Sequence, residues 1–237
     1  MDHARKLHEL WNELEKGDEE AIHEARKLTR KAQAYLRATG APRKTLKPWK
    51  RLRQTIAPFR DLDVTLDHLK KLLRELQADP VTLELLSLHY TTQRIRMWAE
   101  VELPVKPRDL QEPKNASDRV QETLEDDWQS LRKEARKVMK SRESAAWHTW
   151  RKHLKRYRYT WEIEGEAPAE LIELLKHLGH MQDMEVLKEK LEDAPEFLHP
   201  YLPELREVMT QQHDEAQRKA RELWQAWSNT HQVLIES

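Results

Sequence analysis

Glycine is scarce in this sequence, and that scarcity limits the folds open to the chain. Only 4 of the 237 residues are glycine, and the stretches between them are rich in Ala, Leu, Glu, Lys and Arg. These residue types favour helices. With 38 % hydrophobic residues, the composition is typical of helices that pack through amphipathic faces. We therefore predict an all-α fold and exclude a large β-domain.

Prolines and glycines divide the chain into helix-length segments. The stretch 103–117 contains three prolines and lacks apolar periodicity, so we predict a Pro-rich connector at 104–117 between a first helical half, 1–103, and a second, 118–237. Each half should hold about four to five helices. The expected helices cover 2–16, 19–38, 44–56, 59–77 and 81–101, then 118–140, 143–163, two shorter ones near 165–168 and 179–182, and 203–235.

The second half repeats motifs of the first in the same order. Residues 23–31 and 148–156, 125 positions apart, both read His-x-x-basic-basic-x-x-basic-basic. Residues 61–64 (Asp-Leu-Asp-Val) and 183–186 (Asp-Met-Glu-Val) match at a shift of 122. Two ordered matches at nearly equal shifts indicate a duplicated helical unit.

On a helix, the basic positions of both copies form one stripe, with apolar residues on the opposite side. Residues 23–53 hold 11 Lys and Arg with one acid, and residues 131–158 hold 11 with two acids, which leaves 20 basic and 39 acidic residues elsewhere. An ordinary solvated helix mixes charges to gain pairing, so this segregation favours binding of a polyanion. The predicted core faces are Ile22, Ala25, Leu28, Ala32, Tyr35 and Leu36, and Trp147, Trp150, Leu154, Tyr157 and Trp161.

The paired motifs resemble the CHAD family, the conserved histidine α-helical domain. The resemblance rests on residues 23–31 with 60–64 (R-D-L-D-V), on 148–156 with 182–186 (Q-D-M-E-V), and on Y-R-Y-x-x-E at 157–162. It implies two helical bundles related by internal pseudo-two-fold symmetry. It also implies a central basic groove or pore, lined by His, Arg and Lys from both halves, that binds inorganic polyphosphate without established catalytic activity. Gln182 and Glu185 depart from the expected Arg and Asp.

Carried over position by position, the resemblance predicts the polyphosphate-binding residues, with three added from neighbouring helices. They are His23, Arg26, Lys27, Arg30, Lys31, Arg51, Arg53, His148, Arg151, Lys152, Lys155, Arg156 and Lys176. Arginine can bridge adjacent phosphate oxygens, whereas lysine acts as a mobile point charge. The alternative for the two histidines is a core position satisfied by backbone groups.

Four carboxylates are predicted to orient nearby Arg or Lys side chains rather than to catalyse: Asp61, Asp63, Asp183 and Glu185. No activated nucleophile accompanies them. Glu20-x-x-His23 and Glu196-x-x-His199 have the spacing of a di-iron bundle, but Arg26 beside His23 would repel a metal cation. We therefore expect no metal, no cofactor and no enzyme activity.

Two other functions use the same surface chemistry. A nucleic-acid protein could bind phosphates through these stripes, but Tyr159 is the only obvious aromatic residue there for stacking on bases. A metal-dependent phosphohydrolase is the weaker alternative. The chain has no cysteine, and no apolar run of about 18 residues that could span a bilayer. We expect a cytoplasmic protein with no membrane partner, associated with free or granular polyphosphate.

Overall fold

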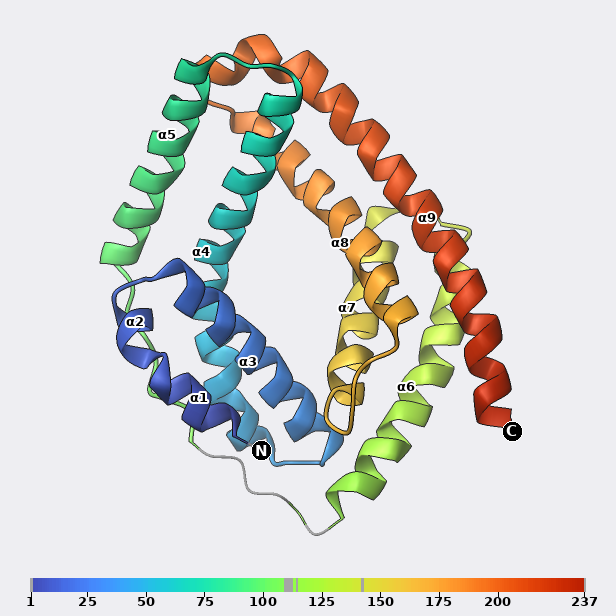
Figure 1. The fold of residues 1–237 in the computed structure, drawn as a ribbon. Coiled ribbons are helices and arrows are strands. Elements are labelled where there is room, and N and C mark those ends of the chain that lie inside the picture. The colour runs from blue at the N-terminus through green and yellow to red at the C-terminus, as the bar shows by residue number, and fades with distance from the viewer. Residues whose placement is uncertain (1, 109–112, 114, 142, 237) are drawn as a thin grey trace. The chain divides into compact units, whose positions relative to one another are not determined.

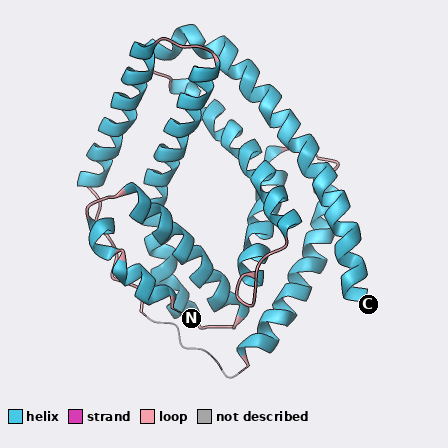
Figure 2. Ribbon diagram, in the orientation of Figure 1, coloured by secondary structure: helices cyan, strands magenta, loops and turns pink. Residues whose placement is uncertain are grey.

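The computed structural model describes residues 2–108, 113, 115–141 and 143–236, and in these residues all regular structure is helical (Figures 1 and 2). This confirms the predicted all-α class. The chain divides into two compact units, Met1–Val120 and Gln121–Ser237, called unit 1 and unit 2 below. Parts of the predicted connector, 109–112 and 114, lie outside the described residues.

Unit 1 is built around two long helices that pack against each other. The elements are α1 (His3–Glu9), α2 (Trp11–Glu15), α3 (Glu19–Ala38), α4 (Arg43–Glu75) and α5 (Pro80–Ala99). The short α1 and α2 pack on α3, α3 packs on α4, and α5 runs back along α4 (Figure 1). The connector lies on this unit, where His8 Nε2 is 2.9 Å from the Pro107 carbonyl oxygen.

Local sequence signals fix the bounds of α3 and α5. Asp18 caps α3 by accepting from the Ala21 amide at 2.8 Å, and Asp79 caps α5 by accepting from the Thr82 amide at 3.0 Å. The chain leaves α3 through Gly40, whose φ of 69° suits the left-handed turn after a helix. The predicted helix 19–38 is confirmed at both ends.

Unit 2 contains α7 (Ser144–Trp161), α8 (Ala169–Lys190), two short 3-10 segments (Leu191–Asp193 and Glu196–Tyr201) and α9 (Leu202–Glu236). Helix α6 (Ala116–Val138) begins in the last residues of unit 1 and lies mostly in unit 2. Helix α8 packs on both α7 and α9.

Three predicted helix boundaries are wrong. Helix α4 is continuous through Pro48 and Pro58, although helices at 44–56 and 59–77 were expected. A proline inside a helix costs about 3 kcal/mol, which burial of Ile56, Phe59 and other apolar side chains can offset. Helix α8 likewise continues through Gly179, and the predicted helix 2–16 divides at Leu10.

Both units bury aliphatic and aromatic side chains, and the aromatic rings of unit 2 form a cluster. In unit 1 the apolar side chains are mostly aliphatic, as with Leu7, Ile22 and Leu69, which are fully buried. In unit 2 aromatic rings pack on one another, and the ring centroids of Trp150 and Trp224 lie 5.0 Å apart. The predicted core faces of α3 and α7 are confirmed as buried, except that Trp161 is only half-buried.

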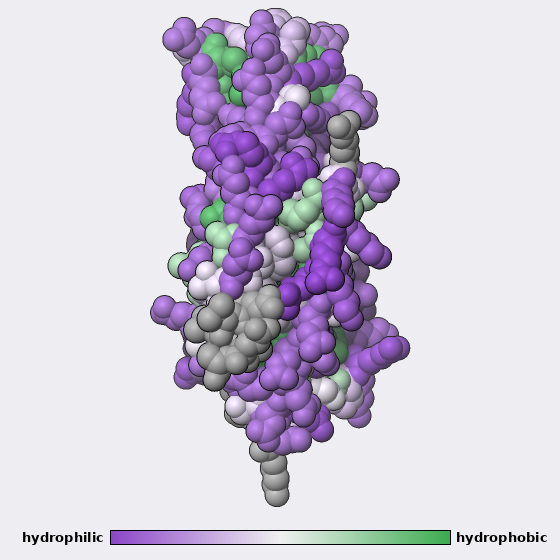
Figure 3. All heavy atoms as spheres, turned by 90° about the vertical axis from the view of Figure 1, so that its right-hand side faces the viewer, coloured by the Kyte–Doolittle hydropathy of each residue, from purple (hydrophilic) through white to green (hydrophobic). Residues whose placement is uncertain are grey.

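The surface reflects the high content of charged residues. The face drawn in Figure 3 is mostly hydrophilic, with hydrophobic side chains confined to small separate patches. Small apolar patches of this kind are ordinary on soluble domains. Charged side chains therefore dominate this face.

Candidate functional site

Arg26 is a largely enclosed cation among those predicted. It lies on α3 opposite α4, where its Nη1 donates to the Ala57 carbonyl oxygen at 2.6 Å and to Asp61 Oδ1 at 2.9 Å. The Arg26 side chain is 12 % exposed, while that of Asp61 is 60 % exposed. Burial lowers the pKa of Arg26, and the Asp61 carboxylate opposes that effect. The Asp61 carboxylate thus orients the Arg26 guanidinium but remains largely exposed to solvent.

Two further arginines add positive charge around Arg26. Arg30 lies one turn further along α3, and its charge lowers the pKa of Arg26. Arg53 projects from α4, and its pKa is lowered by burial first and then by the charges of Arg30 and Arg26. Within the described residues, neither Arg30 nor Arg53 forms an ion pair with a carboxylate. We call Arg26, Arg30 and Arg53 the arginine cluster.

The arginine cluster is suited to an anion for a simple electrostatic reason. Three guanidinium groups close together, partly removed from water, repel one another. An anion with several oxygens would relieve that repulsion and accept two hydrogen bonds from each guanidinium. Asp61 supplies only one carboxylate for the three groups.

The remaining predicted cations of unit 1 have different surroundings. Lys27 pairs with Glu24 on its own helix, with 3.1 Å between Nζ and Oε1, and His23 is part-exposed nearby. Lys31 lies towards α1, because its charge lowers the pKa of His3 there. Burial is the main cause of that shift, which takes the His3 pKa to about 4. Arg51 is exposed on α4.

In unit 2, α7 and α8 bring His148 and Arg151 against the second acidic motif. His148 Nδ1 donates a hydrogen bond to Gln182 Oε1 on α8. Arg151 lies against Gly179, where an added Cβ atom would come within 3.4 Å of Nη2. In the sequence repeat, Arg151 corresponds to Arg26 at the 125-residue shift, and Gly179 corresponds to Ala57 at the 122-residue shift. Each unit therefore places its first motif arginine over a small residue of the next long helix.

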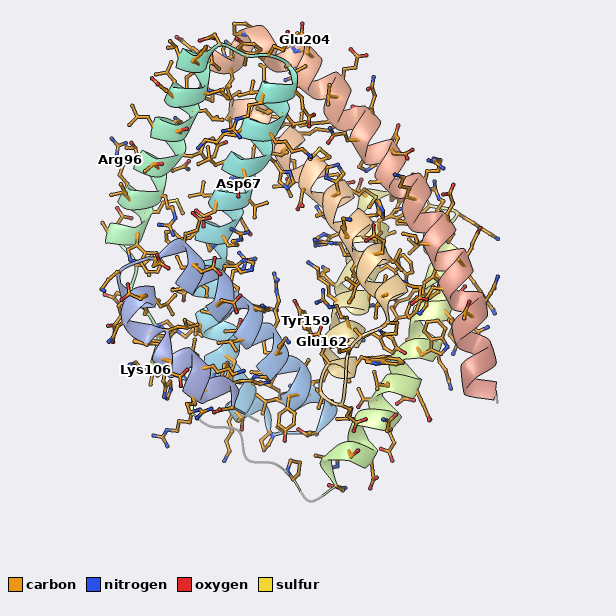
Figure 4. All side chains as sticks on the ribbon, viewed as in Figure 1. Asp67, Arg96, Lys106, Tyr159, Glu162 and Glu204 are labelled. Carbon is orange, nitrogen blue, oxygen red and sulfur yellow. The ribbon has the colours of Figure 1, made fainter. Side chains whose placement is uncertain are left out.

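The other predicted cations of unit 2 point in several directions. Arg156 turns to α6, where its Nη2 lies 2.9 Å from Asp127 Oδ1, and Lys176 pairs with Glu173 at 3.2 Å. Lys152 is exposed, and Lys155 is half-buried. Tyr159 lies near the end of α7, as does Glu162 (Figure 4). The Arg158 guanidinium lies over the Tyr159 ring.

Three of the four predicted orienting carboxylates contact cations from other helices. Asp61 holds Arg26, as described, while Asp63 accepts from Arg94 Nε of α5 at 2.8 Å. Glu185 lies 3.2 Å from His213 Nε2 of α9. Asp183 is half-buried on α8.

Sequence reasoning missed several residues that complete these contacts. Arg94 and His213 lie 31 and 28 positions from their carboxylates, outside both motifs, so no local spacing marks them. Arg60 was visible in the R-D-L-D motif, and its Nη1 lies 3.4 Å from Glu19 Oε1. Asp127, the partner of Arg156, is a buried carboxylate outside both motifs.

The described residues contain no group of three or more His, Asp or Glu side chains placed to hold a metal ion. Glu20 and His23, and likewise Glu196 and His199, are thus without the further ligands that a di-iron centre requires. What the site offers chemically is a set of hydrogen-bond donors and positive charges.

These observations define an all-helical protein with cationic helix faces and paired basic and acidic motifs. The chain belongs to the CHAD family: the family model described as CHAD domain matches residues 1–169. That match includes both basic motifs and the first acidic motif, whereas the second acidic motif at 182–186 lies beyond it.

Among solved structures, the fold is similar to that of PptA from Streptomyces chartreusis, with a TM-score of 0.63 and 16 % sequence identity. The alignment covers 94 % of this chain and 95 % of that one. The comparison with curated proteins gave no match. Among the helices that the structure describes, none has the length and apolarity needed to cross a bilayer.

Proposed function

We propose that this protein binds inorganic polyphosphate through cationic faces on α3–α4 and α7–α8, and that it performs no chemistry of its own. The observation that carries the proposal is the arginine cluster, in which three part-buried arginines lie close enough to repel one another and Asp61 pairs with Arg26. Membership of the CHAD family supports the same ligand.

Polyphosphate fits this surface because it carries closely spaced oxygens and no base or sugar to recognise. Arginine can bridge neighbouring phosphate oxygens, and the exposed Lys152 can follow a flexible chain as a mobile charge. Nucleic-acid binding would draw on the same charges, but Tyr159 is half-buried under Arg158 and does not offer a stacking platform.

A competition titration distinguishes these ligands. Long-chain polyphosphate, duplex DNA and single-stranded DNA, matched in phosphate concentration, are titrated at one fixed salt concentration. We expect polyphosphate to displace either DNA, and tighter DNA binding would overturn the proposal. Incubation of the protein with polyphosphate and Mg²⁺ should leave chain length unchanged, whereas shortening would show catalysis.

The groove shared by both halves, expected from the sequence, stays a prediction. One chain that carries two cationic faces turns the second binding event into an intramolecular one. Affinity should therefore rise with polyphosphate length and then level off, with pyrophosphate and triphosphate binding weakly. If Arg151, Lys152, Lys155 and Arg156 are neutralised together, this length dependence should flatten. A mutant that keeps the wild-type preference for long chains would contradict joint binding.

A further inference from the structure

One pair of corresponding positions differs in chemistry between the two units. At the 122-residue shift, Asp63 of α4 corresponds to Glu185 of α8. Each carboxylate binds a cation from the helix that packs next to it: Arg94 of α5 in unit 1 and His213 of α9 in unit 2. The same structural link between two helices is thus made by a guanidinium in one unit and by an imidazole in the other.

Both links are enclosed enough for their charge to matter. The Asp63 side chain is 5 % exposed, and the side chains of Glu185 and His213 are each 16 % exposed. A hydrogen bond between charged groups is stronger than a neutral one, and more so away from bulk water. Arginine keeps its charge at every physiological pH, whereas histidine loses its proton near neutral pH.

The surroundings of His213 favour the charged pair. The hydrogen bond to Glu185 raises the pKa of His213, burial opposes this, and Asp214 beside it on α9 raises the pKa further. For Glu185, burial acts to raise the pKa, but hydrogen bonds from His213 and Ser144 and the charges of His213 and His148 outweigh it, so the net shift is downward. The charged neighbours that act on the pair are thus Asp214 of α9 and His148 of α7.

We propose that His213 forms a pH-dependent tie between α9 and α8, which weakens when the imidazole loses its proton and leaves the Glu185 carboxylate uncompensated beside His148. The effect on ligand rests on the proposed function. An uncompensated carboxylate near His148 opposes a polyanion, so unit 2 attracts polyphosphate less strongly as pH rises. Unit 1 has no such response, because Arg94 compensates Asp63 throughout.

The direction of the stability change follows from linkage. A histidine whose folded-state pKa is raised contributes stability that is fully present below the ordinary imidazole pKa of about 6.5, and this is lost as pH rises through the folded-state pKa. Because the pKa of Glu185 is lowered, the carboxylate stays charged, and the pair stays intact, down to a pH below the ordinary glutamate pKa. The tie is therefore strongest in mildly acidic solution.

The first experiment uses the ligand-free protein and compares His213→Gln with wild type from pH 6 to pH 9. At pH 6 the variant should melt about 2–4 °C below wild type, the size expected for one lost charge-assisted hydrogen bond in a chain of this length. The difference should shrink towards pH 9. His89→Gln, at an exposed histidine of α5, is the matched control and should show no such trend. A melting difference that is the same at every pH would overturn the tie.

Two further variants keep the test sharp. His213→Arg should remove the pH dependence by making the tie permanent, as Arg94 does in unit 1. Glu185→Gln should lower the His213 pKa measured by NMR titration towards its ordinary value. A His213 pKa unaffected by Glu185→Gln would contradict the proposed pairing, whether or not the arginine variant folds.

The ligand arm separates this inference from the proposed function. The ratio of polyphosphate affinity at pH 6 to that at pH 8 should be about two- to threefold smaller in His213→Gln than in wild type, roughly the effect of one weakly coupled charge. If wild type binds polyphosphate and the ratio is unchanged in the variant, the tie does not act on the site. If wild type binds at neither pH, the proposed function fails while the melting and NMR results still decide the tie.

Discussion

Unit 1 and unit 2 carry different side chains at corresponding motif positions. Arg60 of unit 1 corresponds to Gln182 of unit 2, and Asp63 binds an arginine where Glu185 binds a histidine. The charge of the Asp63–Arg94 pair is therefore fixed across the physiological pH range, while that of the Glu185–His213 pair depends on protonation of the imidazole. Both units thus carry a motif arginine on a helix that faces the next long helix, while the charged partners of the acidic motifs differ.

The cluster of aromatic rings in unit 2 gives the largest expected mutational effect. Trp150 is fully buried among the aromatic side chains of unit 2. Trp150→Ala should lower the free energy of unfolding by about 3–5 kcal/mol, because it removes a large buried ring and leaves a cavity. Chemical denaturation followed by circular dichroism measures this. Trp161→Ala, at a half-buried ring of the same helix, should cost less, and equal costs would contradict the aromatic core.

A comparison of charge-neutralised variants sharpens the contrast between the two binding faces. At pH 8, Arg30→Gln with Arg53→Gln should weaken polyphosphate binding by about tenfold or more, the size expected when charge-assisted hydrogen bonds are lost. Lys152→Gln with Lys155→Gln removes the same charge from unit 2 and should cost less, because ammonium groups bind phosphate as single point charges. Isothermal titration calorimetry measures both. A larger loss from the lysine pair would reverse the proposed ranking of the units.

The smallest expected effect concerns the small residue beneath each motif arginine. Unit 1 has Ala57 where unit 2 has Gly179. Gly179 does not need a positive φ, and an added Cβ would lie at an ordinary 3.4 Å from Arg151 Nη2. Gly179→Ala should therefore raise the free energy of unfolding by about 0.5–1 kcal/mol through helix propensity. A destabilised variant would show that Arg151 cannot tolerate the extra methyl group.

Sequence patterns predicted those parts of the molecule that depend on local signals. The bounds of α3 follow from the Asp18 cap and the Gly40 turn, and both basic motifs were found from their spacing. Pro58 and Gly179 were misleading, because tertiary packing of the neighbouring apolar side chains offsets a local cost of about 1–3 kcal/mol. The partners Arg94 and His213 come from other helices at distant positions, so only the fold brings them to the motif carboxylates.

The central claim is that the cationic helix faces bind polyphosphate, and paired charge reversals test it most directly. Arg30→Glu with Lys155→Glu changes one cation on each face, while Lys71→Glu with Lys219→Glu makes the same change in net charge at residues outside the proposed site. Titration with long-chain polyphosphate at fixed salt, with helicity checked by circular dichroism, compares the two variants. The account predicts that the first variant loses binding while remaining helical and that the second retains it. Equal affinity of the two variants would contradict the account.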